Sequence, residues 1–365
     1  MTLPDFPWDS LAQEAATAGA HPDGIIDLSI GTPVEPVPDP VATALREAWN
    51  SPGYPQTWGT PALRSAVVDA LVRRHGADSS TGSGLSPDAV LPTIGSKEFV
   101  AWAPTLLGLG AGDVVAIPDL AYPTYEVGAR LVGATAVRVA DADPLPPFTR
   151  LLWLNSPSNP TGRVLPAKAL AARVAEARSI GAVVASDECY LALPGPDAHP
   201  VTVLDPRVHG GTLDGLLAVH SLSKSSNLAG YRAAFVAGDS ALIGQLLAIR
   251  KHAGMIVPRP VQEAMTAALR DDAHVADTRA RYNARRAVLA PALESAGLRI
   301  NHSEAGLYLW ATADEGCRAT VGWLAARGIL VAPGEFYGPD GARHVRIALT
   351  ATDERIATAV RRLSA

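Results

Sequence analysis

Short apolar runs alternate with amphipathic stretches over most of the first 270 residues. Runs rich in valine, leucine and isoleucine predict strands at 114–117, 135–139, 151–155, 182–186, 216–220 and 232–237. Between them, apolar positions that recur every three or four residues predict helices at 61–75, 96–107, 123–132, 166–180 and 240–252. Because strands separated by helices pair in parallel, this pattern predicts an α/β fold: a mainly parallel, seven-stranded type of sheet covered by helices.

The pattern changes after about residue 270. An arginine- and alanine-rich stretch predicts a long helix at 273–296. An α+β pattern follows, with strands predicted at 306–311, 329–332 and 344–348 and helices at 318–327 and 352–363. We therefore expect three parts. An N-terminal arm at 1–35, with a short strand at 25–30, packs with the small domain, the large domain covers 36–270, and the small C-terminal domain covers 271–365.

A lysine among hydroxyl groups follows one of the predicted strands. Ser221-Leu222-Ser223-Lys224 comes directly after the strand at 216–220, and Arg232 lies eight residues after the lysine. A lysine amine forms a Schiff base with an aldehyde, while serine hydroxyls and a guanidinium hold a phosphate. A lysine after a strand is usually only solvated, so this motif gains weight from the segments described next.

Polar side chains also follow the neighbouring strands, where such sheets bind ligands. Asp187 could keep a pyridine nitrogen protonated, and Tyr190 could donate a hydrogen bond to a phenolic oxygen on the ring. Asn159 offers an amide to that oxygen or to a substrate carboxylate, and Tyr122 could stack on the ring. Each residue alone is explained by a turn or by core packing, but together they predict a site for pyridoxal 5'-phosphate (PLP).

Two further segments supply anion-binding groups. Gly95-Ser96-Lys97 opens a predicted helix, whose backbone N–H groups and serine hydroxyl suit the phosphate of such a cofactor. Arg346 interrupts an apolar strand, and a buried arginine must find an anion. A structural ion pair is the alternative to the functional interpretation, in which Arg346 binds the α-carboxylate of a substrate.

In this order, and over nearly the whole chain, the motifs resemble the fold-type I PLP enzymes, specifically the class I/II aminotransferases. Matches to the same family include Gly31, Tyr54 with Gly59 and Leu63-Arg64, Asn159-Pro160-Thr161-Gly162 and Pro333-Gly334. The resemblance implies ping-pong amino transfer, in which Lys224 holds PLP and then moves the proton while Asp187 and Tyr190 assist. It also implies a homodimer in which Tyr54 reaches the cofactor of the neighbouring subunit, and it places Gly31 near the substrate carboxylate.

Three segments narrow the resemblance further. Residues 95–98, 186–190 and 258–262 resemble the actinobacterial N-succinyldiaminopimelate aminotransferases of lysine and cell-wall precursor synthesis. Their substrate, N-succinyl-LL-2,6-diaminopimelate, carries extra carboxylates, and the resemblance suggests 2-oxoglutarate as the acceptor.

A substrate with extra carboxylates is expected to need additional cationic side chains near the site. Lys97, Arg163 and Arg259 are the candidates, with a solvated surface charge as the alternative, which is favoured for Arg163. An aminotransferase of the aspartate, glutamate or aromatic type and a PLP-dependent β-lyase remain alternatives for the activity.

Composition excludes several other classes of protein. The 365 residues are 48% hydrophobic, ample for a large core, and the net charge of −5 gives no reason to expect nucleic acid or an anionic membrane as a partner. No apolar run approaches the roughly 20 residues of a membrane span, and the first ten residues lack the features of a secretion signal. The two cysteines and nine histidines show no metal-ligand spacing. We expect a cytoplasmic enzyme without a metal, and a DNA-binding regulator is disfavoured because about thirty residues precede Gly31.

Overall fold

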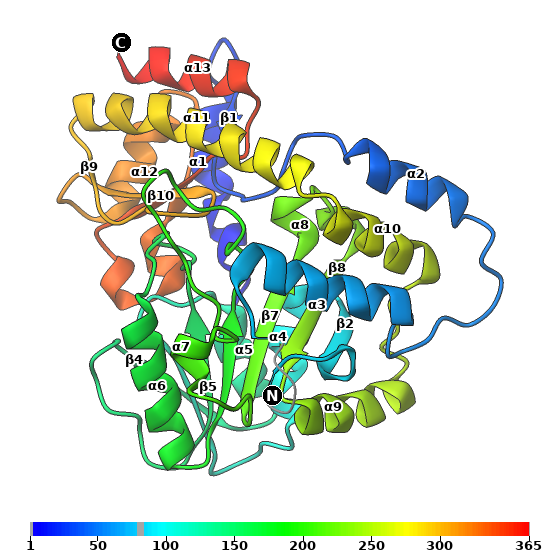
Figure 1. The fold of residues 1–365 in the computed structure, drawn as a ribbon. Helices are drawn as coiled ribbons and strands as arrows, with labels where there is room; N and C mark the ends of the chain where they lie inside the picture. Colours follow the sequence, from blue (N-terminus) through cyan, green and yellow to red (C-terminus); the bar gives the residue numbers. More distant parts are fainter. Residues whose placement is uncertain (1–2, 79–83, 365) are drawn as a thin grey trace.

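The computed structural model describes residues 3–78 and 84–364, and its main element is a seven-stranded sheet (Figure 1). The strand order is β2-β8-β7-β6-β5-β3-β4. The strands are β2 (Val90–Ile94), β3 (Val114–Pro118), β4 (Thr135–Val139), β5 (Thr149–Asn155), β6 (Val183–Asp187), β7 (Leu216–Ser221) and β8 (Ala233–Gly238). Strands β4, β3, β5, β6 and β7 pair in parallel, whereas β8 is antiparallel to both β7 and β2. The expected mainly parallel sheet is therefore confirmed.

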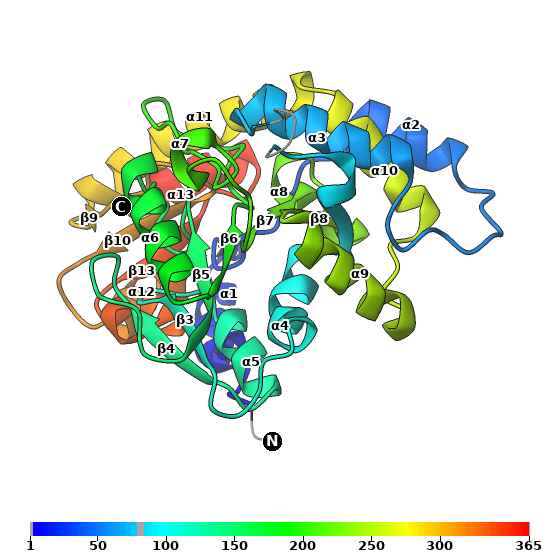
Figure 2. The ribbon, with the colours of Figure 1, turned by 60° about the horizontal axis from the view of Figure 1, so that its bottom comes forward.

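Helices cover both faces of this sheet (Figure 2). One face packs against α3 (Pro61–His75), α6 (Ala167–Ser179) and α10 (Arg259–Arg270), and the other against α4 (Ser96–Leu106), α5 (Thr124–Leu131) and α9 (Ser240–Ala253). In β7, Leu216 and Ala218 belong to the first core, while Leu217 and Val219 belong to the second. Successive strand residues point to opposite faces, so a strand buried on both sides is apolar throughout.

A second, antiparallel sheet lies beside the first. Its order is β12-β13-β10-β9, with β12 (Ala332–Pro333), β13 (Val345–Ala348), β10 (Tyr308–Thr312) and β9 (Arg299–Ile300). The helices of this part are α11 (Ala273–Ser295), α12 (Cys317–Ala325) and α13 (Asp353–Leu363). The N-terminal residues join it through α1 (Ala12–Gly19), which packs on α12, and through β1 (Ile26–Asp27), which pairs in parallel with β11 (Ile329–Leu330). The domain boundaries near residues 35 and 270 stay a prediction.

Two predicted strands are shorter than expected. The strand predicted at 25–30 ends at Asp27, because the Asp27 side chain accepts hydrogen bonds from the backbone N–H and the hydroxyl of Ser29, at 2.8 and 2.7 Å. The strand predicted at 329–332 is divided into β11 and β12, which pair with different strands. Just after β1, the carbonyl oxygen of Leu28 accepts a hydrogen bond from the backbone N–H of Ala348 at the end of β13, at 2.8 Å.

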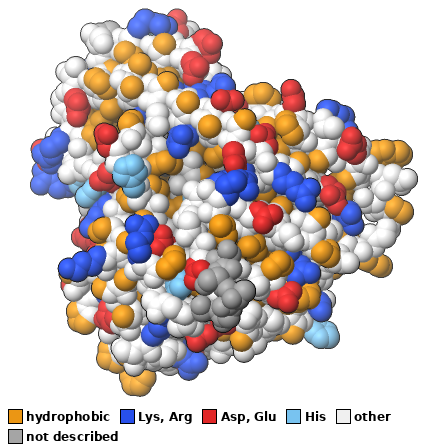
Figure 3. Space-filling view, in the orientation of Figure 1, with side chains coloured by type: hydrophobic (Ala, Val, Ile, Leu, Met, Phe, Trp, Pro, Cys, Tyr) orange, Lys and Arg blue, Asp and Glu red, His pale blue; other side chains and the backbone are white. Residues whose placement is uncertain are grey.

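The face of the molecule shown in Figure 3 carries charged side chains of both signs. In Figure 3, lysine, arginine, aspartate and glutamate side chains are interspersed over the face shown. Within the described residues, no helix is both long and apolar enough to cross a membrane.

Candidate active site

Lys224 lies at the edge of the large sheet where the parallel strands end. It belongs to α8 (Leu222–Ser225), which follows β7 directly, and its Nζ donates a hydrogen bond to the carbonyl oxygen of Gly31. Burial lowers the pKa of the Lys224 amine. Tyr308 and Cys189 oppose this effect, and the charges of Arg346 and Arg232, which act more weakly than these two, add to the lowering. An amine with a lowered pKa attacks an aldehyde and exchanges protons more readily near neutral pH.

Asp187 occupies the corresponding position at the end of β6. Its carboxylate accepts a hydrogen bond from the Tyr125 hydroxyl at 2.9 Å and one from the Cys189 backbone N–H at 3.2 Å. Burial raises the pKa of Asp187, and the bonds from Cys189 and Tyr125 counteract this rise. Tyr125 is held by stacking on Trp153, at 4.9 Å between ring centroids, and Tyr122 meets its edge at 5.9 Å. Sequence reasoning missed Tyr125, whose hydroxyl meets the Asp187 carboxylate.

Arg346 connects the two sheets at this point. It lies on β13, is 3% exposed, and donates to the side-chain oxygen of Asn159 and to the carbonyl oxygen of Ser29, both at 2.8 Å. Its guanidinium lies 4.0 Å from the ring centroid of Tyr308. The Tyr308 hydroxyl is in turn 3.1 Å from the hydroxyl of Tyr190. The predicted residues Asn159, Tyr190 and Arg346 therefore form one connected cluster.

Tyr308 is the central residue of this cluster that the sequence did not reveal. Burial raises its pKa, but the charges of Arg346 and Lys224 outweigh that effect, so the pKa lies below its ordinary value. A Cβ on Gly31 would lie 2.0 Å from the Tyr308 hydroxyl oxygen, so a residue larger than glycine has no room there. The strand Tyr308–Thr312 is buried throughout, and a tyrosine in such a strand has the sequence signature of core packing.

Two of the residues predicted to bind the phosphate, Gly95 and Arg232, lie side by side. Gly95, at φ +77°, precedes the first turn of α4, and a Cβ built on it would lie 2.1 Å from Nη2 of Arg232. Arg232 itself adopts a left-handed backbone conformation, with φ 55°. Ser223 is buried, and its backbone N–H donates to the Ser221 hydroxyl at 3.1 Å. A glycine, a guanidinium and the start of an eleven-residue helix that begins with Ser96 suit a phosphate.

Together these residues fit PLP. A lysine, a buried aspartate, a tyrosine hydroxyl and a phosphate cradle are the protein groups that a phosphorylated pyridine aldehyde requires. Lys224, Asp187 and Tyr190 would supply the first three, and the Arg232 guanidinium, which lies where a Cβ on Gly95 would be, would supply part of the fourth at the start of α4.

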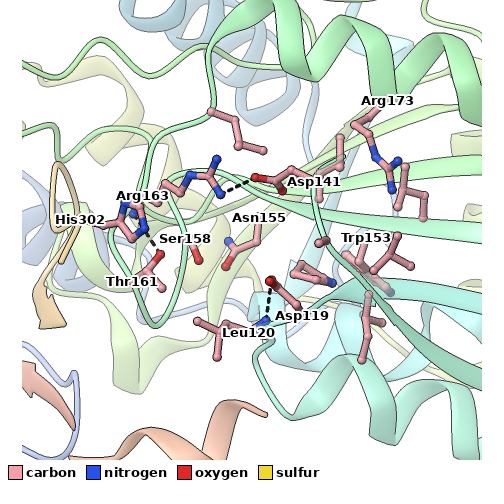
Figure 4. A pocket seen from close by; sticks show the side chains of 17 residues that line it. Asp119, Leu120, Asp141, Trp153, Asn155, Ser158, Thr161, Arg163, Arg173 and His302 are labelled. Atoms are coloured by element: carbon pink, nitrogen blue, oxygen red, sulfur yellow. Dashed lines mark hydrogen bonds and ion pairs between the residues drawn. The ribbon is translucent and has the colours of Figure 1, made fainter. Parts of the chain in front are cut away.

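Tyr54 and the candidate cations lie outside this cluster. Tyr54 is 100% exposed and lines a surface hollow of about 630 Å³ together with Arg259, whose Nε lies 2.6 Å from Glu263. Arg163 lies 2.5 Å from Asp141 in a separate cavity of about 130 Å³ (Figure 4). The exposed Lys97 has its Nζ 5.5 Å from the ring centroid of Phe6.

The lowered pKa of Lys224 predicts how covalent capture of PLP depends on pH. Only the neutral amine attacks the aldehyde, so the rate should reach half its maximum below the ordinary lysine value of 10.5. Stopped-flow absorbance of cofactor-free protein mixed with PLP, from pH 6 to 11, measures this rate, with the ε-amine of free N-acetyl-lysine as the control. A midpoint at or above the control would contradict the prediction.

Comparison with known proteins agrees with this geometry. The family model described as "Aminotransferase class I and II" matches residues 23–363. A probable aminotransferase of Mycobacterium tuberculosis is 61% identical over 364 residues, which cover 100% of this chain and 86% of that protein. The 4-dedimethylamino-4-oxo-anhydrotetracycline transaminase OxyQ of Streptomyces rimosus is 55% identical, with 99% of each chain covered.

A solved structure extends the agreement to three dimensions. The N-succinyldiaminopimelate aminotransferase of Mycobacterium tuberculosis superimposes with a TM-score of 0.85 at 26% identity, covering 99% of each chain. The chain therefore belongs to the class I and II aminotransferases, which are PLP-dependent enzymes.

Proposed function

We propose that this aminotransferase transfers the amino group of N-succinyl-LL-2,6-diaminopimelate to 2-oxoglutarate in lysine and diaminopimelate biosynthesis. The observation that carries the amino-acid chemistry is that the Arg346 charge acts on the buried Lys224 amine, while the Arg346 guanidinium donates to the side-chain oxygen of Asn159 across the two sheets. The likeness to a solved enzyme named for this substrate supports the specific choice.

Each residue of the site has its own role toward an amino-acid substrate in this proposal. When bound, PLP supplies an aldehyde for the amine and an electron sink for the α-carbon. Arg346 and Asn159 would hold the α-carboxylate, and the neutral Lys224 amine would remove the proton from the substrate's α-carbon. Asp187 keeps the ring nitrogen protonated, and the hydroxyl of Tyr190 donates to the ring oxygen. The cradle of Gly95, Ser96, the Lys97 backbone, Ser221, Ser223 and Arg232 holds the phosphate.

The same proposal includes assembly into a cytoplasmic homodimer. Tyr54, which is fully exposed, and Trp49, which is 78% exposed, follow α2 (Asp39–Glu47) on one projecting segment (Figure 1). Large exposed aromatic side chains on one segment mark a surface that binds another protein. A second copy that buries them would bring Tyr54 to the phosphate of the neighbouring site, as the family resemblance implies.

Titration of the purified PLP-bound protein tests this function. We expect the absorbance of the bound cofactor to change to that of its aminated form with both N-succinyl-LL-2,6-diaminopimelate and glutamate. Conversion by glutamate alone would discard the succinylated substrate and keep the aminotransferase. Release of pyruvate and ammonia without a keto-acid acceptor would instead identify a β-lyase.

Lys97 is the candidate cation that remains available for the distal carboxylates of this substrate. Arg163 and Arg259 are each paired with a carboxylate, whereas Lys97 is exposed at the first turn of α4 beside Phe6. Lys97→Gln should raise KM for N-succinyl-LL-2,6-diaminopimelate about tenfold while leaving KM for glutamate within about twofold, since a hydrogen-bonded charge contributes about 1.5–3 kcal/mol. Steady-state kinetics with Arg163→Gln as the matched control check this, and equal changes for both donors would contradict it.

A second candidate substrate is a large polycyclic ketone. The relative OxyQ is named for such a compound. Two aromatic residues of the N-terminal arm contact predicted site residues: Phe6 lies beside the Lys97 amine, and the ring centroid of Trp8 lies 5.8 Å from the guanidinium carbon of Arg346. Formation of a ring amine from anhydrotetracycline-type ketones and glutamate, followed by mass spectrometry, distinguishes this candidate from the succinylated amino acid.

A further inference from the structure

A buried ion pair lies beside the first turn of α4, where the phosphate of the cofactor is proposed to bind. Glu98 is the third residue of α4, and Arg250 lies in the last turn of α9. Nη1 and Nη2 of Arg250 donate to the two carboxylate oxygens of Glu98, at 2.8 and 3.2 Å. The Arg250 side chain is 0% exposed and that of Glu98 is 18% exposed. This two-point contact fixes the carboxylate in both position and orientation.

Apolar packing sets the place of Arg250. Helices α9 and α4 cover the same face of the large sheet, and Ile243 and Leu246 of α9 share a core with Phe99 of α4 (Figure 2). Leu246 precedes Arg250 by one helical turn, so both side chains lie on the same side of α9. A buried guanidinium is tolerated there because Glu98 pairs with it, and the loss of either partner would leave an uncompensated charge.

The Glu98 carboxylate also holds the turn between β2 and α4. Its Oε2 accepts a hydrogen bond from the backbone N–H of Ile94, the last residue of β2, at 3.3 Å. Ile94 and Glu98 thus enclose residues 95–97, the segment proposed to bind the phosphate. On the other side, Ile94 pairs with Ala233 of β8, which directly follows Arg232. Arg250 therefore orients a carboxylate that ties down the proposed phosphate-binding turn.

The charge of Glu98 needs compensation at this place. A phosphate monoester carries a charge of about −1.5 to −2 near neutral pH, and an anion at the start of α4 would lie within one helical turn of Glu98. Two negative charges so near repel each other. Arg250 supplies the opposite charge, which leaves the N–H groups of the first turn and the Arg232 guanidinium to attract the phosphate.

We propose that Arg250 is a positioning residue for the phosphate of PLP. It holds the Glu98 carboxylate against the turn at Ile94 and cancels its charge, so that the start of α4 favours a phosphorylated pyridine aldehyde over the same aldehyde without phosphate. Because the Arg250 side chain is fully buried, it acts on the phosphate through Glu98 and not by contact. The inference rests on the phosphate site of the proposed function.

Comparison of PLP with pyridoxal, which lacks the phosphate, tests this role. Quenching of tryptophan fluorescence in cofactor-free protein gives the two dissociation constants. Both compounds carry the aldehyde that Lys224 is proposed to bind, so the ratio of the constants isolates the phosphate. Arg250→Met keeps an apolar chain of similar length and should weaken PLP binding about tenfold, while pyridoxal binding stays within about twofold. Arg250→Lys keeps the charge without the two-point contact and should give an intermediate ratio.

The matched control is Arg173→Met. Arg173 of α6 is also buried and paired, with Glu176 at 2.8 Å, but α6 covers the opposite face of the sheet, so the ratio should not change.

Two kinds of outcome would contradict the proposal or its basis. An Arg250→Met variant that weakens PLP and pyridoxal binding equally, or weakens neither, would overturn the positioning role. If Arg250→Met does not fold, as judged by circular dichroism, Arg250→Lys decides, and a ratio equal to that of the unsubstituted protein would overturn the role. An unsubstituted protein that binds PLP no more tightly than pyridoxal would instead overturn the phosphate site on which this inference rests.

Discussion

Replacement of Lys224 by alanine is expected to lower kcat by about 10⁴-fold or more, the largest effect of any single substitution in this chain. Lys224 performs two tasks: its amine binds the PLP aldehyde covalently, and it then carries the proton at the substrate's α-carbon, a task that alone contributes up to about 10⁴-fold. The amine is placed for both, because its hydrogen bond to Gly31 and its lowered pKa result from the same buried position. Steady-state and single-turnover kinetics with glutamate and 2-oxoglutarate provide the measurement.

The design of this experiment separates lost chemistry from lost structure. Lys251→Ala removes an exposed lysine of α9 and should leave turnover unchanged. In Lys224→Ala, the thermal unfolding temperature should stay near that of the unsubstituted protein, and a small exogenous amine should restore part of the proton transfer. Near-native activity in Lys224→Ala would remove this residue from the mechanism.

The residues that follow strands could be predicted from sequence, for a physical reason. A polar residue directly after a buried apolar run is visible as a break in the pattern, and parallel strands end at one edge of the sheet. Asp187 and Lys224 were found in this way, and the structure places both at the carboxyl edge, Asp187 at the end of β6 and Lys224 directly after β7. Tyr125 and Tyr308 were not, because a tyrosine inside an apolar helix or strand has the same pattern whether its hydroxyl meets a carboxylate or only fills space.

Strand β2 and helix α10 are among the elements that the sequence analysis did not predict. Strand β2 contains Pro92, which argues against a strand, but β2 is the edge strand of the sheet and pairs only with β8, where proline is tolerated. Helix α10 begins with Arg259-Pro260, and proline in the first turn is a start signal that the sequence reasoning did not use. The sequence could not predict the contact between the buried side chains of Glu188 and His220 either. Their 3.1 Å approach depends on the register between β6 and β7.

Replacement of Arg346 by alanine should raise KM about 100-fold for every α-amino acid, with a smaller change in kcat. Each hydrogen bond between charged groups contributes about 1.5–3 kcal/mol, so losing a two-point grip on a carboxylate corresponds to about two powers of ten or more. The side chain is 3% exposed and its guanidinium is already oriented by Asn159, Ser29 and the ring of Tyr308, so little entropy is lost when a carboxylate binds.

A substrate without an α-carboxylate tells this role apart from a general structural one. Arg346→Ala should react with a simple primary amine as slowly as the unsubstituted enzyme does, because that amine never used the guanidinium. Arg346→Lys keeps the charge but loses the planar two-point geometry, and should give KM values between those of the other two proteins. Unchanged absorbance of bound PLP in all three would show that the cofactor site is intact. A KM for glutamate that does not change would place the carboxylate grip on another residue, and the link between the two sheets through Asn159 would then serve the fold alone.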